Sequence, residues 1–308
     1  MRIYRKPNRA IENSVITIGS YDGIHLGHQA VIAKTIAVAK SQGCACGLVT
    51  FDPIPQQVIH PEFHYILTTL NEKKEILSQL GLDFLYLINF NKKIQSLAPT
   101  EFIKTQIIET IHPTKIVVGY DHRFGSEGRG DVELLKILAK KFGFKLLVVS
   151  ECLYRGEPIK STRIRERLLL GDIKTANRLL GRNYSISGKV TKGLGIGKLI
   201  GFPTVNLMVS ETKKLIPMDG VYAVYVVYQG KRYPGAMNIG CRPTFSGDVR
   251  TIEATLLNPP KSNLYGAKLK IELVDRIRSE QKFENITALA SQIAKDIKQA
   301  EKILKSEN

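Results

Sequence analysis

The hydrophobic pattern of this 308-residue chain changes once, near residue 185, and that change constrains the fold more than any other feature. Before it, short apolar runs rich in β-formers alternate with helical stretches. The apolar runs occupy residues 14–19, 47–51, 84–90, 115–119 and 145–150, and the clearest helical stretches occupy 30–39, 71–80, 99–111 and 131–142. Alternation of this kind predicts an α/β domain, a parallel sheet covered by helices on both faces.

After residue 185 the strong runs are rich in Val, Tyr and Ile and are separated by Gly, Pro and Asn, which predicts an antiparallel sheet or small barrel. Gln229 and Gly230 are typical of a hairpin tip. Two short helical stretches, 163–170 and 174–180, precede the change, so we expect one domain at 1–182 and another at 183–308. A terminal helix should dock on the barrel through the apolar positions Ile286, Leu289, Ile293, Ile297 and Leu304.

Composition narrows the class of protein. No apolar run approaches the roughly 18 residues that a membrane span needs, and the first residues lack the apolar stretch of a signal peptide, so we expect a cytoplasmic protein with no membrane partner. The four cysteines are too few and too scattered for a disulfide framework or a zinc site, so we expect free thiols at Cys44, Cys46, Cys152 and Cys241.

The formal net charge of +17 raises nucleic acid as a partner. Lysine and arginine are nevertheless spread along the whole chain, without a dense basic tail, and there is no Trp. Polyanionic small substrates explain the charge equally well, and we expect no nucleic-acid partner. A basic RNA-binding barrel remains the rival from another functional class.

The segment ITIGSYDGIHLGH, residues 16–28, joins an apolar strand to a tight turn and then a helix. Gly19, Asp22 and Gly23 allow the reversal. His25 and His28 then lie where a parallel strand gives way to a helix amino terminus, which is the usual ligand edge of an α/β sheet and attracts phosphate. The alternative is that His25 packs in the core and His28 serves as a cap.

No P-loop motif is present, so phosphate must be held by backbone amides of this turn and by cations elsewhere. The best candidates lie in STRIR at a second helix start. Hydroxyls of Ser161 and Thr162 can bond phosphate oxygens, and Arg163 and Arg165 can neutralise a triphosphate. The alternative for the two arginines is solvated surface charge.

The turn resembles the H-x-G-H signature of nucleotidyltransferases, and the longer GSYDGIHLGHQAVI resembles the adenylyltransferase half of the bacterial bifunctional riboflavin kinase/FAD synthetase family. Further matches follow in order, and the resemblance covers nearly the whole chain. They are TFDP at 50–53, VVGYDHRFGSEGRGD at 117–131 and STRIRERLLLGD at 161–172. The resemblance implies a Rossmann-like nucleotidyltransferase domain. In it His25 and His28 stabilise the transferring group, Gly19, Asp22 and Gly23 bind ATP, and Asp121 lies near the adenosine of ATP.

Two positions of this half depart from the family pattern. Ile54 replaces the histidine of TF(D/E)PHP, which puts in doubt any phosphate or flavin contact there. Lys160 replaces the first serine of SSTxIR. A lysine beside a triphosphate would add a flexible cation to the ATP site, and the alternative is that it points into solvent.

GKVTKGLGIGKLIGFPTVNL, residues 188–207, resembles the riboflavin kinase signature, in which a glycine-rich flap precedes a PTAN-like motif. Thr204 and Asn206, two apart on an extended segment, point the same way and offer hard oxygen ligands for the Mg²⁺ that carries ATP phosphates. A turn-forming Asn is the alternative reading. The flap residues expected to bind ATP or flavin are Gly193, Gly195, Gly197 and Lys198.

Downstream, the resemblance implies that Glu253 is the general base and that Arg278 contacts flavin or phosphate. In isolation, a Glu flanked by apolar strand residues reads as solvated. The loop Asn258–Asn263 lacks the acidic residues usual in the family.

The resemblance of both halves implies a bifunctional enzyme that phosphorylates riboflavin to FMN in its second half and adenylylates FMN to FAD in its first half, releasing pyrophosphate. Both steps would use ATP and Mg²⁺. A member that retains only one step is the nearer rival, and the oligomeric state stays open.

Overall fold

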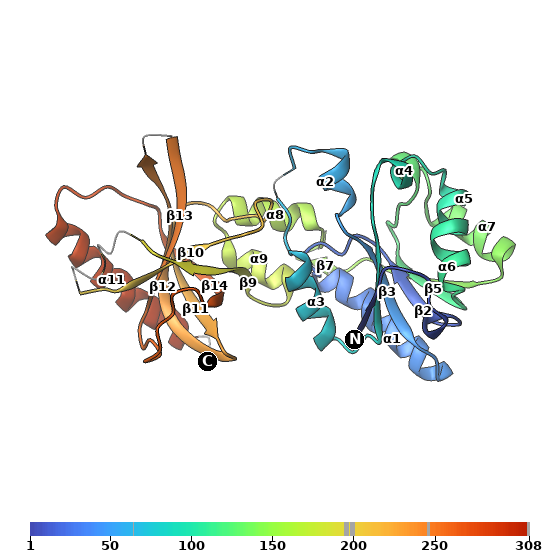
Figure 1. Cartoon of the computed structure of the whole chain (residues 1–308), viewed down its shortest axis with the longest axis horizontal. Coiled ribbons are helices and arrows are strands. Elements are labelled where there is room, and N and C mark those ends of the chain that lie inside the picture. Colours follow the sequence, from blue (N-terminus) through green and yellow to red (C-terminus); the bar gives the residue numbers. More distant parts are fainter. Residues whose placement is uncertain (64, 194–196, 198–200, 245–246, 307–308) are drawn as a thin grey trace. The chain divides into compact units, whose positions relative to one another are not determined.

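The computed structural model describes the whole chain except residues 64, 194–196, 198–200, 245–246 and 307–308. Its contacts divide the chain into two compact units, Met1–Ser161 and Thr162–Asn308 (Figure 1). The stretch 162–182 therefore belongs to the second unit. The functional boundary expected between residues 182 and 183 remains a prediction.

The first unit is built on a six-stranded sheet in the order β1-β4-β3-β2-β5-β6. Every neighbouring pair in it is parallel, as the alternating pattern predicts. The strands are β1 (Arg2–Tyr4), β2 (Val15–Ile18), β3 (Cys46–Phe51), β4 (Phe84–Ile88), β5 (Lys115–Gly119) and β6 (Lys145–Val149). The chain leaves β2 toward β3 on one side while β5 lies on the other, so the topological switch point falls between β2 and β5.

Helices cover both faces of this sheet, and each face has its own apolar core. Val31 of α1 and Leu77 of α3 pack on one face, whereas Phe102 of α5 and Leu135 of α7 pack on the other. The helices are α1 (Leu26–Gln42), α2 (Pro55–Ile59), α3 (Leu70–Gln79), α4 (Lys92–Gln95), α5 (Pro99–Phe102), α6 (Glu109–Ile111) and α7 (Val132–Phe142). Short 3-10 turns lie at η1 (Arg9–Ile11) and η3 (Ser126–Gly128), and β7 (Leu153–Tyr154) pairs with β8 (Glu157–Pro158).

The single helix expected at 99–111 is three segments, since a π-helical stretch, η2 (Ile103–Ile108), separates α5 from α6. Ile103, Ile107 and Ile111 are all buried, a spacing of four. Strand β1 had no sequence signal because it has only three residues.

The second unit begins with α8 (Ser161–Leu169), whose first residue closes the first unit, and α9 (Ile173–Leu180). A closed barrel follows, in the order β10-β13-β12-β11-β14-β9. Its strands are β9 (Tyr184–Thr191), β10 (Thr204–Met208), β11 (Gly220–Tyr228), β12 (Lys231–Thr244), β13 (Gly247–Leu256) and β14 (Lys268–Arg278). Gln229 and Gly230 form the expected hairpin tip between β11 and β12, with φ of 49° and 76°. The predicted antiparallel barrel is confirmed.

The terminal helix α11 (Ile286–Lys305) packs on the outside of β11, β12 and β14 (Figure 1). Ala300 and Leu304 contact Ala223 and Val274, and the Tyr225 hydroxyl donates to the Leu304 carbonyl at 3.1 Å. The helix therefore docks on the barrel as expected, but Ile286 in its first turn is 64% exposed and takes no part.

None of the described helices has the length and hydropathy that a bilayer crossing requires. All four cysteines are free thiols, as predicted.

Candidate active sites

The turn between β2 and α1 lies at the switch point of the first sheet and has unusual backbone conformations. Tyr21 and Ile24 have φ of 47° and 42°, and Gly23 has φ of 88°. A β-branched residue such as Ile24 is rarely found in the left-handed region, because its Cβ substituents crowd the backbone there. The surrounding structure must hold this turn in place.

His25 and His28 stand together at the start of α1. Their rings stack with centroids 3.6 Å apart, and Tyr21 lies against His28 at 4.9 Å. His25 is the helix cap, since its Nδ1 accepts from the His28 N–H at 3.3 Å. The proton of neutral His25 then lies on Nε2, which is a donor. A Cβ at Gly27 would lie 3.2 Å from the His25 ring, so the glycine leaves room for it.

Asp22 is buried, and its carboxylate is bonded to another segment of the same unit. It accepts from the N–H of Leu67 at 2.9 Å and of Thr68 at 3.0 Å. Thr68 Oγ1 in turn accepts from the Gly23 N–H at 3.1 Å. Gly19 ends the strand against the Tyr21 ring, 3.0 Å from where a Cβ would lie. Asp22 thus shapes the turn, and any contact between Asp22 and ATP stays a prediction.

Two further predicted ATP-binding positions meet the switch point. Ser161 Oγ donates to the Asp22 carbonyl at 2.8 Å. Lys160 Nζ lies 3.9 Å from an oxygen of Asp121, which follows β5, and each side chain is 54% exposed. Thr162, Arg163 and Arg165 lie in the second unit, so their approach to ATP remains a prediction from sequence.

In the barrel, three polar side chains form a row across adjacent strands. Asn206 on β10 lies directly opposite Glu253 on β13, and Glu253 lies directly opposite Asn238 on β12. Ile252 and Ala254 alternate with Glu253 and are buried in the barrel interior. The row therefore lies on the outer face, and Thr204, two residues before Asn206, shares that face.

The described part of the glycine-rich flap runs against this row. A Cβ on Gly193 would overlap the Asn206 amide, and one on Gly197 would lie 3.2 Å from Thr204 Oγ1. The Phe202 N–H closes the flap onto the Gly197 carbonyl at 2.8 Å. Gly195 and Lys198 lie outside the described residues.

Comparison with known proteins decides the family. The FAD synthetase family model matches residues 8–163, and the riboflavin kinase model matches residues 180–304. Curated relatives named bifunctional riboflavin kinase/FMN adenylyltransferase align with 92% or more of the chain, across both matched regions. The chain belongs to this bifunctional family.

The relative from Bacillus subtilis is 37% identical over 293 residues, which is 93% of this chain and 91% of the relative. The one from Buchnera aphidicola of Schizaphis graminum is 36% identical over 291 residues, 92% of each chain. The one from Escherichia coli K12 is 33% identical over 287 residues, 92% of this chain and 91% of the relative. A solved structure named a macrolide-efflux protein, from Streptococcus pneumoniae, has a TM-score of 0.86 at 30% identity and covers 96% of both chains.

Arg278, which the resemblance predicts to contact flavin or phosphate, is held by the terminal helix. Its Nε and Nη2 donate to the Asp296 carboxylate, at 2.9 and 2.7 Å, and its Nη1 donates to the Ser279 carbonyl. Asp296 is 4% exposed. The guanidinium anchors α11 to the end of β14, and its predicted flavin or phosphate contact is untested.

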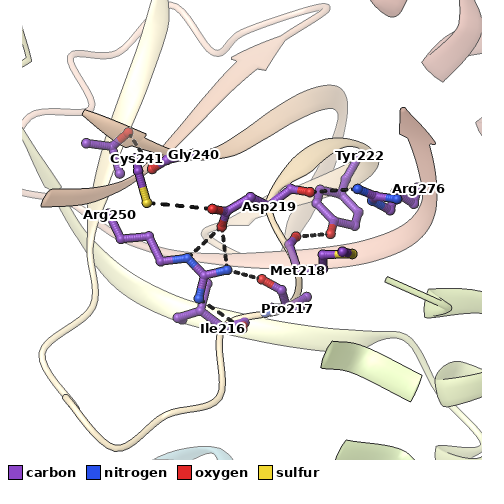
Figure 2. Close-up of polar contacts among 10 residues, drawn as sticks. Ile216, Pro217, Met218, Asp219, Tyr222, Gly240, Cys241, Arg250 and Arg276 are labelled. Atoms are coloured by element: carbon purple, nitrogen blue, oxygen red, sulfur yellow. Dashed lines mark hydrogen bonds and ion pairs between the residues drawn. The ribbon is translucent and has the colours of Figure 1, made fainter. Parts of the chain in front are cut away.

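A second polar cluster supports the strand that carries Glu253 (Figure 2). Arg250, three residues earlier on β13, donates to Asp219 at 2.8 Å and to the carbonyls of Ile216 and Pro217. Arg276 donates to the Asp219 carbonyl at 2.8 Å. The loop before β11 is thereby bonded to β13 and β14, which stabilises the strand on which Glu253 lies.

The structure describes both positions of the first unit that differ from the family pattern, Ile54 and Lys160. Ile54 is 7% exposed and is the residue immediately before α2, so its side chain is part of the packed interior. Lys160 faces Asp121, as described above.

The structure adds residues that had no sequence signal. Asn238 completes the barrel row through strand register alone. His122 is stacked on Phe124, and its buried Nε2 has no partner among the described residues. Burial lowers the His122 pKa to about 4. Lys73, a buried lysine on α3, bonds to the carbonyl of Ser20 in the turn.

Proposed function

We propose that the two units divide two successive steps of flavin-cofactor synthesis. Both family models match, in order, and relatives that carry both activities in their names align over 91% or more of their length. The chain is therefore a riboflavin kinase and an FMN adenylyltransferase. The observation that carries the assignment of steps to units is the placement of one signature in each, the histidine pair in the first and the Asn206–Glu253 row in the second.

In the first unit, a phosphate oxygen of FMN attacks the α-phosphorus of ATP, the bond to the β-phosphate breaks, and pyrophosphate leaves. Negative charge grows on the transferring phosphoryl group during this displacement. The Nε2–H of His25, with the His28 ring stacked on it at the amino end of α1, is placed to stabilise that charge. Positioning and electrostatics supply most of the rate in such reactions.

The polyphosphate and the nucleoside of ATP have separate binding groups in this proposal. Ser161, Thr162, Arg163 and Arg165 bind phosphate oxygens at the start of α8. Lys160 adds a cation, and Asp121 binds the ribose or adenine. The separation of 3.9 Å between Lys160 Nζ and an Asp121 carboxylate oxygen supports a shared location for these two residues.

In the second unit, the ribityl hydroxyl of riboflavin attacks the γ-phosphorus of ATP and ADP leaves. The Glu253 carboxylate accepts the hydroxyl proton as the new bond forms. Its neighbours across the strands, Asn206 and Asn238, are neutral amides, and this placement beside the Asn206 of the PTVN segment supports the proposed role of Glu253 as the base.

Magnesium fits the kinase row as a companion of ATP. Thr204 and Asn206 present a hydroxyl and an amide oxygen on one face, beside a glycine backbone that a Cβ would obstruct. When bound with ATP, Mg²⁺ neutralises phosphate charge. In the described part of the chain no three His, Cys, Asp or Glu side chains group to hold a metal.

The decisive experiment incubates the purified chain with riboflavin, ATP and Mg²⁺ and separates the flavins by chromatography over time. FMN appearing first and FAD later supports both steps, whereas FMN that accumulates without FAD, or FAD made only from supplied FMN, identifies a single-activity member. Riboflavin unchanged under several metal and redox conditions refutes the proposal. The polar substrates and the four free thiols fit a reducing compartment, so we place the enzyme in the cytoplasm.

A further inference from the structure

Lys73 is the feature of the first unit that the mechanism above leaves unused. It lies on α3, 2% exposed, and is one of the largest fully buried side chains in the protein. Its Nζ donates to the Ser20 carbonyl at 2.6 Å and lies 3.4 Å from Thr50 Oγ1. Thr50 Oγ1 donates to the same Ser20 carbonyl at 3.0 Å. Both donors meet at the residue immediately before Tyr21, where φ becomes positive.

The same stretch of chain holds the other side of the turn. The N–H groups of Leu67 and Thr68 bind the Asp22 carboxylate, and Thr68 Oγ1 binds the Gly23 N–H. We call Thr50, Leu67, Thr68 and Lys73 the turn clamp. The turn clamp makes hydrogen bonds to Ser20, Asp22 and Gly23. The strained backbone of the turn is therefore held by residues that lie outside it in the sequence.

A buried ammonium is costly to retain. Among the described residues no carboxylate makes an ion pair with Lys73, and only the more distant Asp22 and Asp52 favour its charge. Asp52 is itself paired with Arg5 at 2.5 Å. Burial lowers the Lys73 pKa to about 8. An apolar side chain of similar length would fill this position at lower cost, so the lysine is better explained by what it binds than by core packing.

We infer that Lys73 is a positioning residue for adenylyl transfer: by binding the Ser20 carbonyl it holds the strained turn that presents His25 and His28 to the α-phosphate. This inference rests on the proposed function of the first unit. Few residues separate Lys73 from the histidines. Tyr21 follows Ser20 in the chain, and the Tyr21 ring packs on His28. Without the ammonium, Thr50 alone would hold the carbonyl, and the turn would sample other conformations.

The test replaces Lys73 by methionine, which keeps the stem and removes the donor. We expect kcat for FAD formation to fall about 30-fold, because small displacements of catalytic groups cost one to two orders of magnitude. The KM values for ATP and FMN should change less than kcat does, since most of the proposed phosphate-binding groups lie at the start of α8. Riboflavin phosphorylation should be unchanged. The melting temperature should not fall, because a costly buried charge is removed.

Lys74→Met is the matched control, because the neighbouring lysine on the same helix is only half-buried, and it should leave kcat unchanged. Thr50→Val removes the second donor and should give a smaller loss than Lys73→Met. A kcat unaffected by Lys73→Met overturns the inference. A loss of activity that follows a lower melting temperature, or that strikes both reactions, assigns Lys73 to folding and overturns it as well.

Amide hydrogen exchange separates this inference from the proposed function. Exchange over residues 19–28 should accelerate about tenfold in Lys73→Met but not in Lys74→Met, as local opening becomes easier. Unchanged exchange refutes the clamp even if FAD is made. A wild-type chain that makes no FAD refutes the adenylyltransferase assignment, and the exchange result then decides alone whether Lys73 holds the turn.

Discussion

The two candidate sites are assembled in opposite ways. The adenylyl-transfer site is centred on one short segment, residues 19–28, whose histidines are neighbours in the chain but whose backbone is held by Thr68 and Lys73 from elsewhere. The kinase row takes one residue from each of three strands, and ordinary strand register alone brings Asn206, Glu253 and Asn238 together. The first site is local in sequence and supported at a distance, whereas the second is dispersed in sequence and supported by its own barrel.

The largest effect should come from Glu253→Gln, which keeps the shape of the side chain and removes the base. FMN production should fall about 1000-fold, within the range for general-base removal. FAD synthesis from supplied FMN should persist, because the histidine site lies in the other unit. Chromatographic assays of each step will measure this, with Asn206→Ala as a second kinase variant. Loss of both steps would show that the two sites are not independent.

His28→Ala should produce the complementary loss. FAD formation should fall about 100-fold, the effect of removing one donor to transition-state charge, and His25→Ala should act similarly. Riboflavin phosphorylation should stay near the wild-type rate. If both activities decline together in His28→Ala, the histidine serves folding and the comparison between the sites fails.

Asp296→Asn tests whether the barrel depends on its terminal helix. Removing one partner of this nearly buried pair leaves the Arg278 guanidinium without its countercharge, and we expect a loss of about 3 kcal/mol in the free energy of unfolding of the second unit. Denaturant titration will measure this loss, with Glu301→Gln, at an exposed position of the same helix, as the control. A variant of unchanged stability but poor flavin binding would instead favour the predicted ligand contact of Arg278.

His122 should make the first unit the more acid-sensitive one. Its folded pKa of about 4 lies below the ordinary value of 6.5, so the unfolded chain binds more protons between these pH values. The stability that this group contributes is complete above pH 6.5 and is lost as pH falls toward 4. His122→Phe should flatten the decline in melting temperature over that window. An identical pH dependence in the variant would contradict the assignment.

The smallest expected effect is that of Lys160→Ser. If Lys160 contacts phosphate in its exposed setting, its removal weakens ATP binding by about 1 kcal/mol and raises the KM for ATP in FAD formation about fivefold, more at low salt. The kinase step should not change. An ATP dependence that is unaltered at low ionic strength would show that Lys160 serves only the surface pair with Asp121.

Sequence alone determined the family, the parallel sheet, the barrel, the hairpin at Gln229–Gly230 and the docking of the terminal helix. It could do so because strand alternation, helical periodicity and turn residues are local patterns that leave a direct trace in the chain. The histidine pair was visible for the same reason, since three residues separate its members.

Only the tertiary structure revealed Asn238 beside Glu253, Asp296 on Arg278, and Lys73 on Ser20. Each of these contacts joins residues far apart in the chain, and strand register or helix packing sets it. Lys73 is the clearest case, since a lysine in an ordinary capped helix carries no signal that it is buried. Its role is visible only because the fold packs α3 against the turn and brings the Lys73 ammonium to the Ser20 carbonyl. A buried donor needs such an acceptor, and the sequence does not show which one it meets.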